Sequence, residues 1–189
     1  MSYYKHEGYK IYYKIDGEGE PLLMIHGSTA SSLMLKEEVD FYSKYFKVII
    51  VDIIGHGNSE RLEEFPVDFW NENTVILRRL CNYLDLNKIN ILGTSGGAII
   101  ALNFALNYPE ITHRVIADSF IGEEFSIEEA KALKEEREYA KMNGANEYWN
   151  YMHGKEWEKV IDADTKMLIK YAKKFGNNFQ GNLDKINCY

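Results

Sequence analysis

The strongest chemical signal in this sequence is a serine set between glycines. Residues 93–97 read Gly-Thr-Ser-Gly-Gly, which matches the pattern G-x-S-x-G around Ser95. With a buried strand before it and an apolar helix after it, this pattern forms a turn that presents the serine hydroxyl as a nucleophile. Side chains at Gly93 and Gly97 would clash there, because strand and helix nearly touch. The alternative is a glycine-rich strand-to-helix turn that contains a serine by chance.

A second loop can supply part of an oxyanion hole. Residues 26–28 read His-Gly-Ser and follow the apolar run at 22–25. A backbone N–H from this loop and the N–H of Gly96 would flank the carbonyl carbon that Ser95 attacks. We expect His26 to hold the loop rather than to act as a base, because it precedes the nucleophile and stands at a strand end.

A third loop has two interpretations. Residues 52–59 read Asp-Ile-Ile-Gly-His-Gly-Asn-Ser and follow another apolar run. The loop could form a wall of the site. We favour the other interpretation, a tight connector in which Asp52 and Ser59 form local hydrogen bonds.

Short apolar runs supply the strands that would position these loops. Four of them are apolar on both faces, as buried parallel strands are. They are residues 22–25, 48–51, 89–92 and 114–117, and a Tyr- and Ile-rich strand is expected before them at 9–15.

Helical patterns separate these strands. We expect a helix capped by Ser31 or Ser32 with Leu35, Val39, Tyr42 and Tyr45 on one face, a helix capped by Asn73, and a small apolar helix over 97–106. The alternation predicts an α/β fold: a mostly parallel sheet with helices on both faces.

The pattern changes after Phe120. Amphipathic helices are expected over 126–142 and 155–175, with no strand between them. We therefore interpret 123–180 as a helical excursion that lies over the sheet.

Composition excludes several classes of protein. The 189 residues suffice for one sizeable core, and 46% hydrophobic residues exclude a mainly disordered chain. A net charge of −7 without a basic run argues against a nucleic-acid partner. Apolar stretches are far shorter than a membrane span, and the N-terminus carries no apolar signal core. Two cysteines make neither a disulfide scaffold nor a zinc site. These features favour a cytoplasmic protein with no membrane association.

These segments together resemble the α/β-hydrolase superfamily, in the branch of esterases, lipases and related cap-bearing hydrolases. The resemblance rests on His26-Gly27, on the loop at 52–59, on 93–97 and on Asn107-Tyr108-Pro109-Glu110. It is close over 9–122 and loose over the helices that follow. The chain departs from the pattern at Ile54, where relatives usually carry Arg.

The resemblance implies a division into three parts and a set of roles. Residues 1–122 would be the N-terminal part of the hydrolase core, 123–180 a helical cap, and 181–189 the start of a truncated return to the core. The nucleophile would be Ser95, the oxyanion donors the backbone N–H groups of Ser28 and Gly96, and the site-shaping residues His26, Gly27, Gly93 and Gly97. No metal or organic cofactor is expected. A serine nucleophile argues against the dehalogenase and epoxide-hydrolase relatives, which use Asp.

The remaining catalytic groups are harder to place. This fold carries its triad in the order Ser, then Asp or Glu, then His. Relatives continue past a segment like Leu183-x-x-Ile186-x-Cys188 into Pro and a strand that ends at the acid, whereas here Tyr189 stands in place of the Pro. We therefore expect that the final two strands, the usual acid and the usual histidine are missing.

Two residues could substitute for the missing groups. His153 is a candidate base and Asp118 a candidate acid, although a half-packed histidine and a polar strand end are the plainer interpretations. Without a base, Ser95 is a weak nucleophile, so we expect weak hydrolysis.

Two functional hypotheses follow. The first is a carboxylesterase-like serine hydrolase with a small-molecule acyl substrate, impaired in this chain. The second is a non-catalytic, hydrolase-like module that binds a small apolar ligand under the cap. The pattern leaves the substrate and the type of bond open. We also expect the strand at 114–117 to form an unprotected sheet edge, through which copies of the chain could associate.

Overall fold

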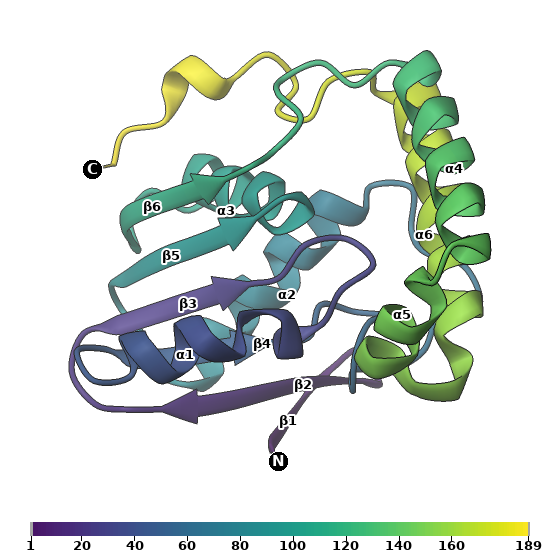
Figure 1. The fold of residues 1–189 in the computed structure, drawn as a ribbon. Coiled ribbons are helices and arrows are strands. Elements are labelled where there is room, and N and C mark those ends of the chain that lie inside the picture. The colour runs from purple at the N-terminus through teal and green to yellow at the C-terminus, as the bar shows by residue number, and fades with distance from the viewer. Residues whose placement is uncertain (1, 189) are drawn as a thin grey trace.

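A computed structural model describes residues 2–188 and contains one six-stranded sheet (Figure 1). The strand order is β1-β2-β4-β3-β5-β6, in which β1, β2 and β4 pair antiparallel and β4, β3, β5 and β6 pair parallel. The strands are β1 (Ser2–His6), β2 (Tyr9–Asp16), β3 (Pro21–Ile25), β4 (Lys47–Val51), β5 (Ile89–Thr94) and β6 (Thr112–Asp118). The predicted α/β fold with a mostly parallel sheet is confirmed, and β1 is a strand that the sequence patterns did not predict.

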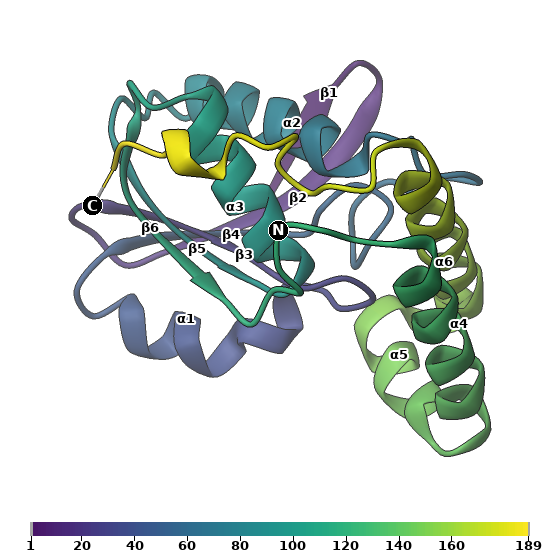
Figure 2. The same cartoon turned by 90° about the horizontal axis from the view of Figure 1, so that it is seen from above.

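Helices cover both faces of the sheet and one end of it. A short 3₁₀ turn and α1 lie on one face, α2 and α3 lie on the other, and α4, α5 and α6 form a separate layer beyond the carboxyl ends of the parallel strands (Figure 2). Their bounds are α1 (Lys36–Tyr42), α2 (Phe69–Tyr83), α3 (Gly96–Asn107), α4 (Ile127–Met142), α5 (Ala145–His153) and α6 (Trp157–Lys174), with 3₁₀ turns η1 (Ser32–Leu35), η2 (Gly154–Glu156) and η3 (Leu183–Lys185).

The core divides into a large and a small part. The central strands are apolar on both faces because each lies between two layers. The large cluster joins the sheet to α2, α3 and the inner sides of α4 and α6, whereas a small cluster around Met24, Val39 and Ile50 packs under α1. The layer α4–α6 therefore shares the main core instead of standing apart from it.

Two predicted helix details are wrong. Asn73 does not cap α2, which begins four residues earlier; its Nδ2 donates to the Phe69 carbonyl (2.9 Å) and its Oδ1 accepts from the Ile54 N–H (3.2 Å). The helix that starts after Ser31 ends at Tyr42, so Tyr45 is 64% exposed rather than on a buried face. Asn73 is buried because its side chain forms a hydrogen bond with a distant loop. A local capping pattern in the sequence does not distinguish such a tertiary contact from a helix cap.

The helices after Phe120 match the prediction in part. Ser126 caps α4 with a complete capping box, in which its Oγ accepts from the Glu129 N–H and the Glu129 carboxylate accepts from the Ser126 N–H. The helix predicted over 155–175 is α6. The sequence analysis missed α5, which is short and begins after Gly144 in a left-handed conformation.

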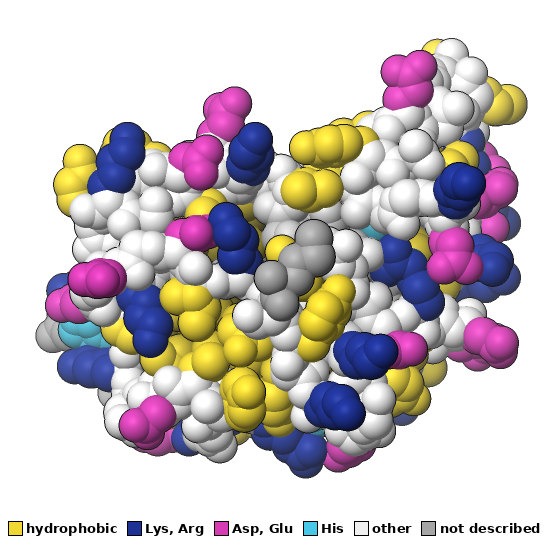
Figure 3. Space-filling view, turned by 90° about the horizontal axis from the view of Figure 1, so that it is seen from below, with side chains coloured by type: hydrophobic (Ala, Val, Ile, Leu, Met, Phe, Trp, Pro, Cys, Tyr) yellow, Lys and Arg dark blue, Asp and Glu magenta, His cyan; other side chains and the backbone are white. Residues whose placement is uncertain are grey.

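The sheet has two edge strands, β6 and β1. At one end lies β6, whose side chains alternate in exposure and whose Ile116 is 55% exposed. At the other end lies β1, where hydrophobic side chains gather among charges of both signs (Figure 3); Tyr3 and Tyr9 are among the exposed aromatic residues of this end. Over residues 2–188, no helix has both the length and the apolar character needed to cross a membrane.

Candidate active site

The turn between β5 and α3 holds Ser95 in a strained backbone conformation. Its φ of 54° and ψ of −120° lie in a region that residues other than glycine seldom adopt. The side chain is exposed although its neighbours on both sides are buried. The strain therefore serves to present the hydroxyl above the carboxyl ends of the strands.

Two glycines make this turn possible. A Cβ at Gly93 would lie 2.5 Å from the carbonyl carbon of Gly97 and closer still to its oxygen. A Cβ at Gly97 would lie 2.5 Å from the carbonyl oxygen of His26. Strand β5, helix α3 and the end of β3 are thus in backbone contact, and only glycine fits at both positions.

The loop after β3 lies directly against the turn that holds Ser95. A Cβ at Gly27 would stand 3.1 Å from the Cβ of Ser95, and a Cβ at Gly96 would stand 3.2 Å from the backbone nitrogen of Ser28. The Ser28 N–H donates to no protein acceptor among the described residues, and the N–H of a first helical residue such as Gly96 has no partner inside its helix. The backbone of Ser28 therefore lies against the start of α3, next to Ser95.

A cavity of about 340 Å³ opens above Ser95. Its floor comes from the two loops and its roof from α4, α6 and the segment that leads into α4. The lining is mostly apolar and consists of Ser28, Thr29, Trp70, Ser95, Gly96, Ile99, Ile121, Phe125, Leu133, Glu136, Arg137, Ala140 and Leu168. Trp70, Glu136 and Arg137 line this cavity but were not predicted from the sequence as site residues.

His26 is fully buried and links two loops. Its Nδ1 lies 2.7 Å from the Gly27 carbonyl oxygen, and its Nε2 accepts from the Ile53 N–H at 3.1 Å. A neutral ring with its proton on Nδ1 satisfies both contacts. Burial lowers the pKa of His26 from 6.5 to about 4, because the effect of burial is larger than the opposing effect of Asp52. These contacts agree with the expected loop-holding role.

His153 is buried between α5 and the loops that carry Thr29 and Gly57. Its Nδ1 accepts from the Gly57 N–H at 3.1 Å, and its Nε2 lies 3.0 Å from the Thr29 carbonyl oxygen. Both ring nitrogens are therefore occupied, and His153 is not among the residues that line the cavity with Ser95. Burial, followed by the nearby His56, lowers the pKa of His153 to about 3.

Asp118 ends β6 next to the turn that holds Ser95. Its carbonyl oxygen accepts from the Ser95 N–H at 2.8 Å, and its carboxylate accepts from the hydroxyls of Thr94 (3.1 Å) and Ser119 (3.0 Å). The side chain is exposed and lies outside the cavity lining. The structure thus brings Asp118 close to Ser95 through the backbone, without a histidine between the two.

Comparison with known proteins identifies the family. A model of the alpha/beta hydrolase fold matches residues 20–146. The chain belongs to the α/β-hydrolase family.

The relatives of this α/β hydrolase are hydrolases of several kinds. The (E)-2-((N-methylformamido)methylene)succinate hydrolase of Acinetobacter baylyi is 30% identical over 131 residues, which make up 66% of this chain and 49% of that protein. Proline iminopeptidase of Clostridioides difficile is 35% identical over 114 residues, 56% of this chain and 38% of that protein. The chain thus spans half or less of the length of these two curated relatives.

Solved structures agree on the fold. An esterase from Exiguobacterium antarcticum superposes with a TM-score of 0.74 at 20% identity, over 96% of this chain and 75% of that chain. The enol-lactonase from Burkholderia xenovorans superposes with a TM-score of 0.69 at 17% identity, over 99% of this chain and 78% of that chain. The expected fold and family are therefore confirmed.

The loop at 52–59 forms the local hydrogen bonds that we predicted for a connector, but Asp52 and Ser59 also bond to the distant residues Ser32 and Tyr12. The Asp52 carboxylate accepts from the backbone N–H groups of Ser32 (2.6 Å) and Asn58 (2.7 Å). The Ser59 hydroxyl donates to the Asp52 carbonyl (2.5 Å) and accepts from the Tyr12 N–H (2.9 Å). No residue of this loop lines the cavity above Ser95.

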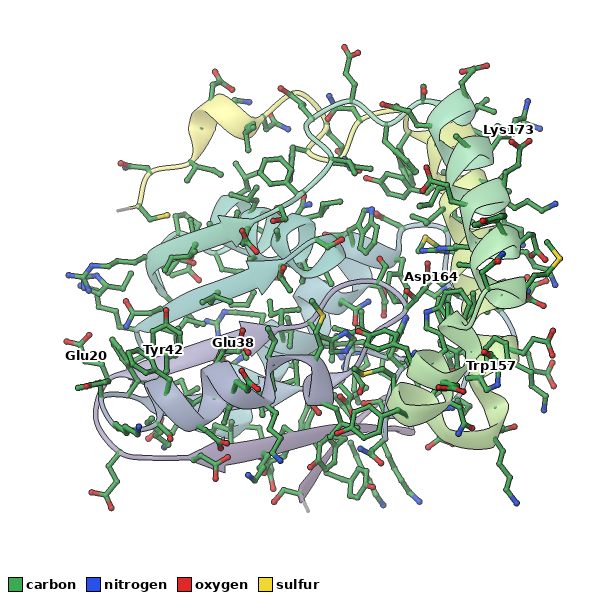
Figure 4. All side chains as sticks on the ribbon, viewed as in Figure 1. Glu20, Glu38, Tyr42, Trp157, Asp164 and Lys173 are labelled. Carbon is green, nitrogen blue, oxygen red and sulfur yellow. The ribbon has the colours of Figure 1, made fainter. Side chains whose placement is uncertain are left out.

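A buried charge cluster joins α4 and α6 to the loop that carries His56. Asp164 of α6 has no exposed surface; its Oδ2 lies 2.8 Å from Nη1 of Arg137, and its Oδ1 lies 3.6 Å from Nε2 of His56. Figure 4 places Asp164 on the core-facing side of α6, whereas Lys173 points outward. Burial raises the pKa of Asp164, but Arg137 and His56 outweigh burial and hold that pKa below its ordinary value. Among residues 2–188 there is no group of three or more His, Cys, Asp or Glu side chains arranged for a metal ion.

The buried histidines predict acid sensitivity. Because the folded-state pKa of His153 is about 3 while an unfolded histidine titrates at 6.5, the unfolded chain binds the extra proton between these values. Stability from the neutral ring is complete above pH 6.5 and declines as pH falls toward 3. At pH 5 we expect a loss of ~2 kcal/mol from this residue relative to pH 7.

Urea denaturation of the His153→Gln variant at both pH values checks this expectation. Glutamine offers a donor and an acceptor without titrating, so the difference between pH 7 and pH 5 should shrink. The matched control is His113→Gln, which replaces a histidine outside the core; burial and the cations Arg114 and Lys88 lower its pKa as well, but not to the extent seen at His153, so the difference should shrink less than in His153→Gln. An unchanged difference in His153→Gln would contradict the assignment.

Proposed function

We propose that this α/β hydrolase transfers acyl groups through Ser95, as a carboxylesterase-like serine hydrolase. The observation that carries the proposal is the exposed Ser95 hydroxyl, held at a strained turn beside two backbone N–H groups and under an apolar cavity. The known relatives include hydrolases, and esterases share its fold. The substrate would be a small acyl ester that fits the cavity.

The chemistry would have two steps. Ser95 Oγ forms a bond to the carbonyl carbon, the bond from that carbon to the alcohol oxygen breaks, and the serine proton ends on the departing alcohol. Water then attacks the acyl-enzyme, so that the acid is released and Ser95 regains its proton. The N–H groups of Ser28 and Gly96 would stabilise the negative oxygen in both steps. In this scheme 123–180 acts as the cap over the core at 1–122, and 181–189 leads back toward the core.

The described site does not contain a well-placed base for these steps. Among residues 2–188 no histidine lines the cavity, and both nitrogens of His153 are engaged elsewhere. General base catalysis contributes about 10² to 10⁴-fold. We therefore propose slow acylation in this chain, with Asp118 and His153 as less favoured substitutes for the acid and the base.

Labelling with a fluorophosphonate probe tests the assignment of the nucleophile. We expect a single adduct on Ser95, located by peptide mass spectrometry and absent from Ser95→Ala. The buried Ser59 and the cavity-lining Ser28 serve as internal comparisons. An adduct on Ser28 that persists in Ser95→Ala would overturn the proposal.

The same absence of a base favours a second candidate function. The chain would then be a non-catalytic module that binds a small apolar ligand between α4, α6 and the loops. Ligand binding that survives Ser95→Ala, together with no probe labelling of the original protein, would support the module and exclude the esterase.

We also propose that copies of the chain associate through β6. This strand is the last of the sheet, and an apolar groove formed by Leu22, Tyr42, Phe46, Ile91, Leu92, Val115 and Ile116 runs beside it. Light scattering at several concentrations should show a dimer or larger species. A monomer at every concentration, with slow amide exchange along 114–118, would contradict this expectation.

A further inference from the structure

Arg137 brings a cation to the cavity above Ser95. It lies on the inner side of α4 with 7% of its surface exposed, and it lines the cavity together with Ser95 and Ser28. Arginine is rarely buried unless it is paired, and an apolar residue would fill the same helix position. A buried guanidinium at the roof of a mostly apolar cavity therefore calls for an explanation.

Neighbours on α6 fix one corner of the guanidinium. Nη1 of Arg137 lies 2.8 Å from Oδ2 of Asp164 and donates to Oγ1 of Thr165 at 2.7 Å. The Thr165 hydroxyl in turn donates to the Ile161 carbonyl at 2.7 Å. These contacts hold the side chain in one orientation, so little conformational freedom remains to be lost when a ligand binds.

The other edge of the guanidinium is open. Nε and Nη2 of Arg137 form no hydrogen bond with any group among residues 2–188. Neither of these two atoms is completely buried. This edge presents two parallel N–H groups, the arrangement that binds a carboxylate with two hydrogen bonds.

The open edge of Arg137 is the group in the cavity lining that can bind an anion. Asp164 is turned away from the cavity lining and is already paired with Arg137. Glu136 is the other charged residue of the lining, and it is exposed, so solvent screens its repulsion. Apolar residues such as Leu133 and Leu168 line the cavity together with Arg137 and Ser95, and an apolar wall beside a charged hydrogen bond strengthens it.

We propose that the acyl group of the substrate carries a carboxylate, which the open edge of Arg137 binds while the ester carbonyl lies at Ser95. The substrate class would be half-esters of short dicarboxylic acids. This inference rests on the proposed function for the role of Ser95, but the binding of the carboxylate does not depend on catalysis.

Calorimetric titration of the Ser95→Ala protein tests the proposal without turnover. The two ligands are monomethyl glutarate, which has a free carboxylate, and dimethyl glutarate, which has none. Hydrogen bonds to charged groups predict that the half-ester binds about tenfold to a hundredfold more tightly. Equal affinities, or no binding of the half-ester at millimolar concentration, would overturn the inference.

Variants of Arg137 in the Ser95→Ala background make the test specific. Arg137→Lys keeps the charge without the paired N–H groups and should lose most of the preference. The double variant Arg137→Met/Asp164→Leu removes the buried pair together, so the fold is not left with an isolated charge, and it should bind both ligands alike. Lys141→Met, on the same helix with its ammonium on the exposed Asp162, should retain the preference.

The outcomes separate this inference from the proposed function. A preference for the half-ester that disappears in the double variant supports the role of Arg137, even where probe labelling of Ser95 fails and the esterase proposal is lost. A preference that persists in the folded double variant overturns the role of Arg137, whatever happens at Ser95.

Discussion

We expect the Arg137→Met substitution to lower the free energy of unfolding by about 3–5 kcal/mol. Methionine preserves much of the buried volume, so the loss comes from Asp164, which would remain fully buried without its cationic partner. Removing one partner of a buried pair is far more damaging than removing both, because an unpaired buried charge keeps its full desolvation penalty.

Urea denaturation of three variants measures this effect. Arg137→Met should be strongly destabilised, and the double variant Arg137→Met/Asp164→Leu should recover most of the loss. The matched control is Lys141→Met, which breaks a pair between the same two helices whose acid, Asp162, is 43% exposed. A change of about 0–1 kcal/mol is expected there. A similar small loss in Arg137→Met would show that the buried pair contributes little.

The pH dependence of the same pair has a definite sign. Because the folded-state pKa of Asp164 lies below its ordinary value, the stability it provides is present at neutral pH and is lost only as pH falls through that lowered pKa. This loss begins below the ordinary aspartate pKa of 3.8, where it overlaps the window of His153, which extends to about pH 3; titration of the His153→Gln variant separates the two effects.

We expect Gly93→Ala to prevent folding or to lower the free energy of unfolding by more than about 3 kcal/mol. The new methyl group would lie 2.5 Å from the Gly97 carbonyl carbon and 2.8 Å from the backbone nitrogen of Ala98. These are backbone atoms at the start of α3, which cannot move aside as a flexible side chain would. The displacement of α3 would also move Ser95, so any folded remainder should label slowly.

Gly122→Ala is the control for this substitution. Gly122 has a φ of +102° but nothing within 4 Å of its added Cβ, so only backbone strain of about 1–3 kcal/mol is expected. Circular dichroism and urea unfolding compare the two variants. Equal stability of Gly93→Ala and the original protein would show that β5 and α3 are less tightly joined than the structure indicates.

The elements that local patterns encode could be predicted from the sequence. The apolar runs at 22–25, 48–51 and 89–92 are strands β3 to β5, since a strand enclosed by two layers must be apolar on both faces. The run at 114–117 is also a strand, β6, but the expectation that it is buried on both faces is wrong, because it lies at the edge of the sheet. The helix after Ser126 is confirmed by its capping box. The turn around Ser95 was also predictable, because its two glycines are a steric requirement that is written in the sequence itself.

Other features depended on partners far away in the chain. Asn73 looked like a helix cap, yet it serves the Ile54 N–H across the fold. His153 looked like a candidate base, but Gly57 and Thr29 occupy its ring. The pairing of Arg137 with Asp164, 27 positions apart, arises only when α4 packs on α6.

The sequence alone thus determined five of the six strands and the turn at Ser95, because each rests on short-range sterics or on the pattern of apolar residues, and its motifs resembled the family that the comparison confirmed. Only the tertiary structure decided which polar side chains form hydrogen bonds or ion pairs within the fold and which remain free to bind a ligand. The physical reason is that a buried polar group must find a partner wherever one lies in space. Sequence spacing does not reveal that partner, and the open edge of Arg137 is visible only after every other contact of the side chain is known.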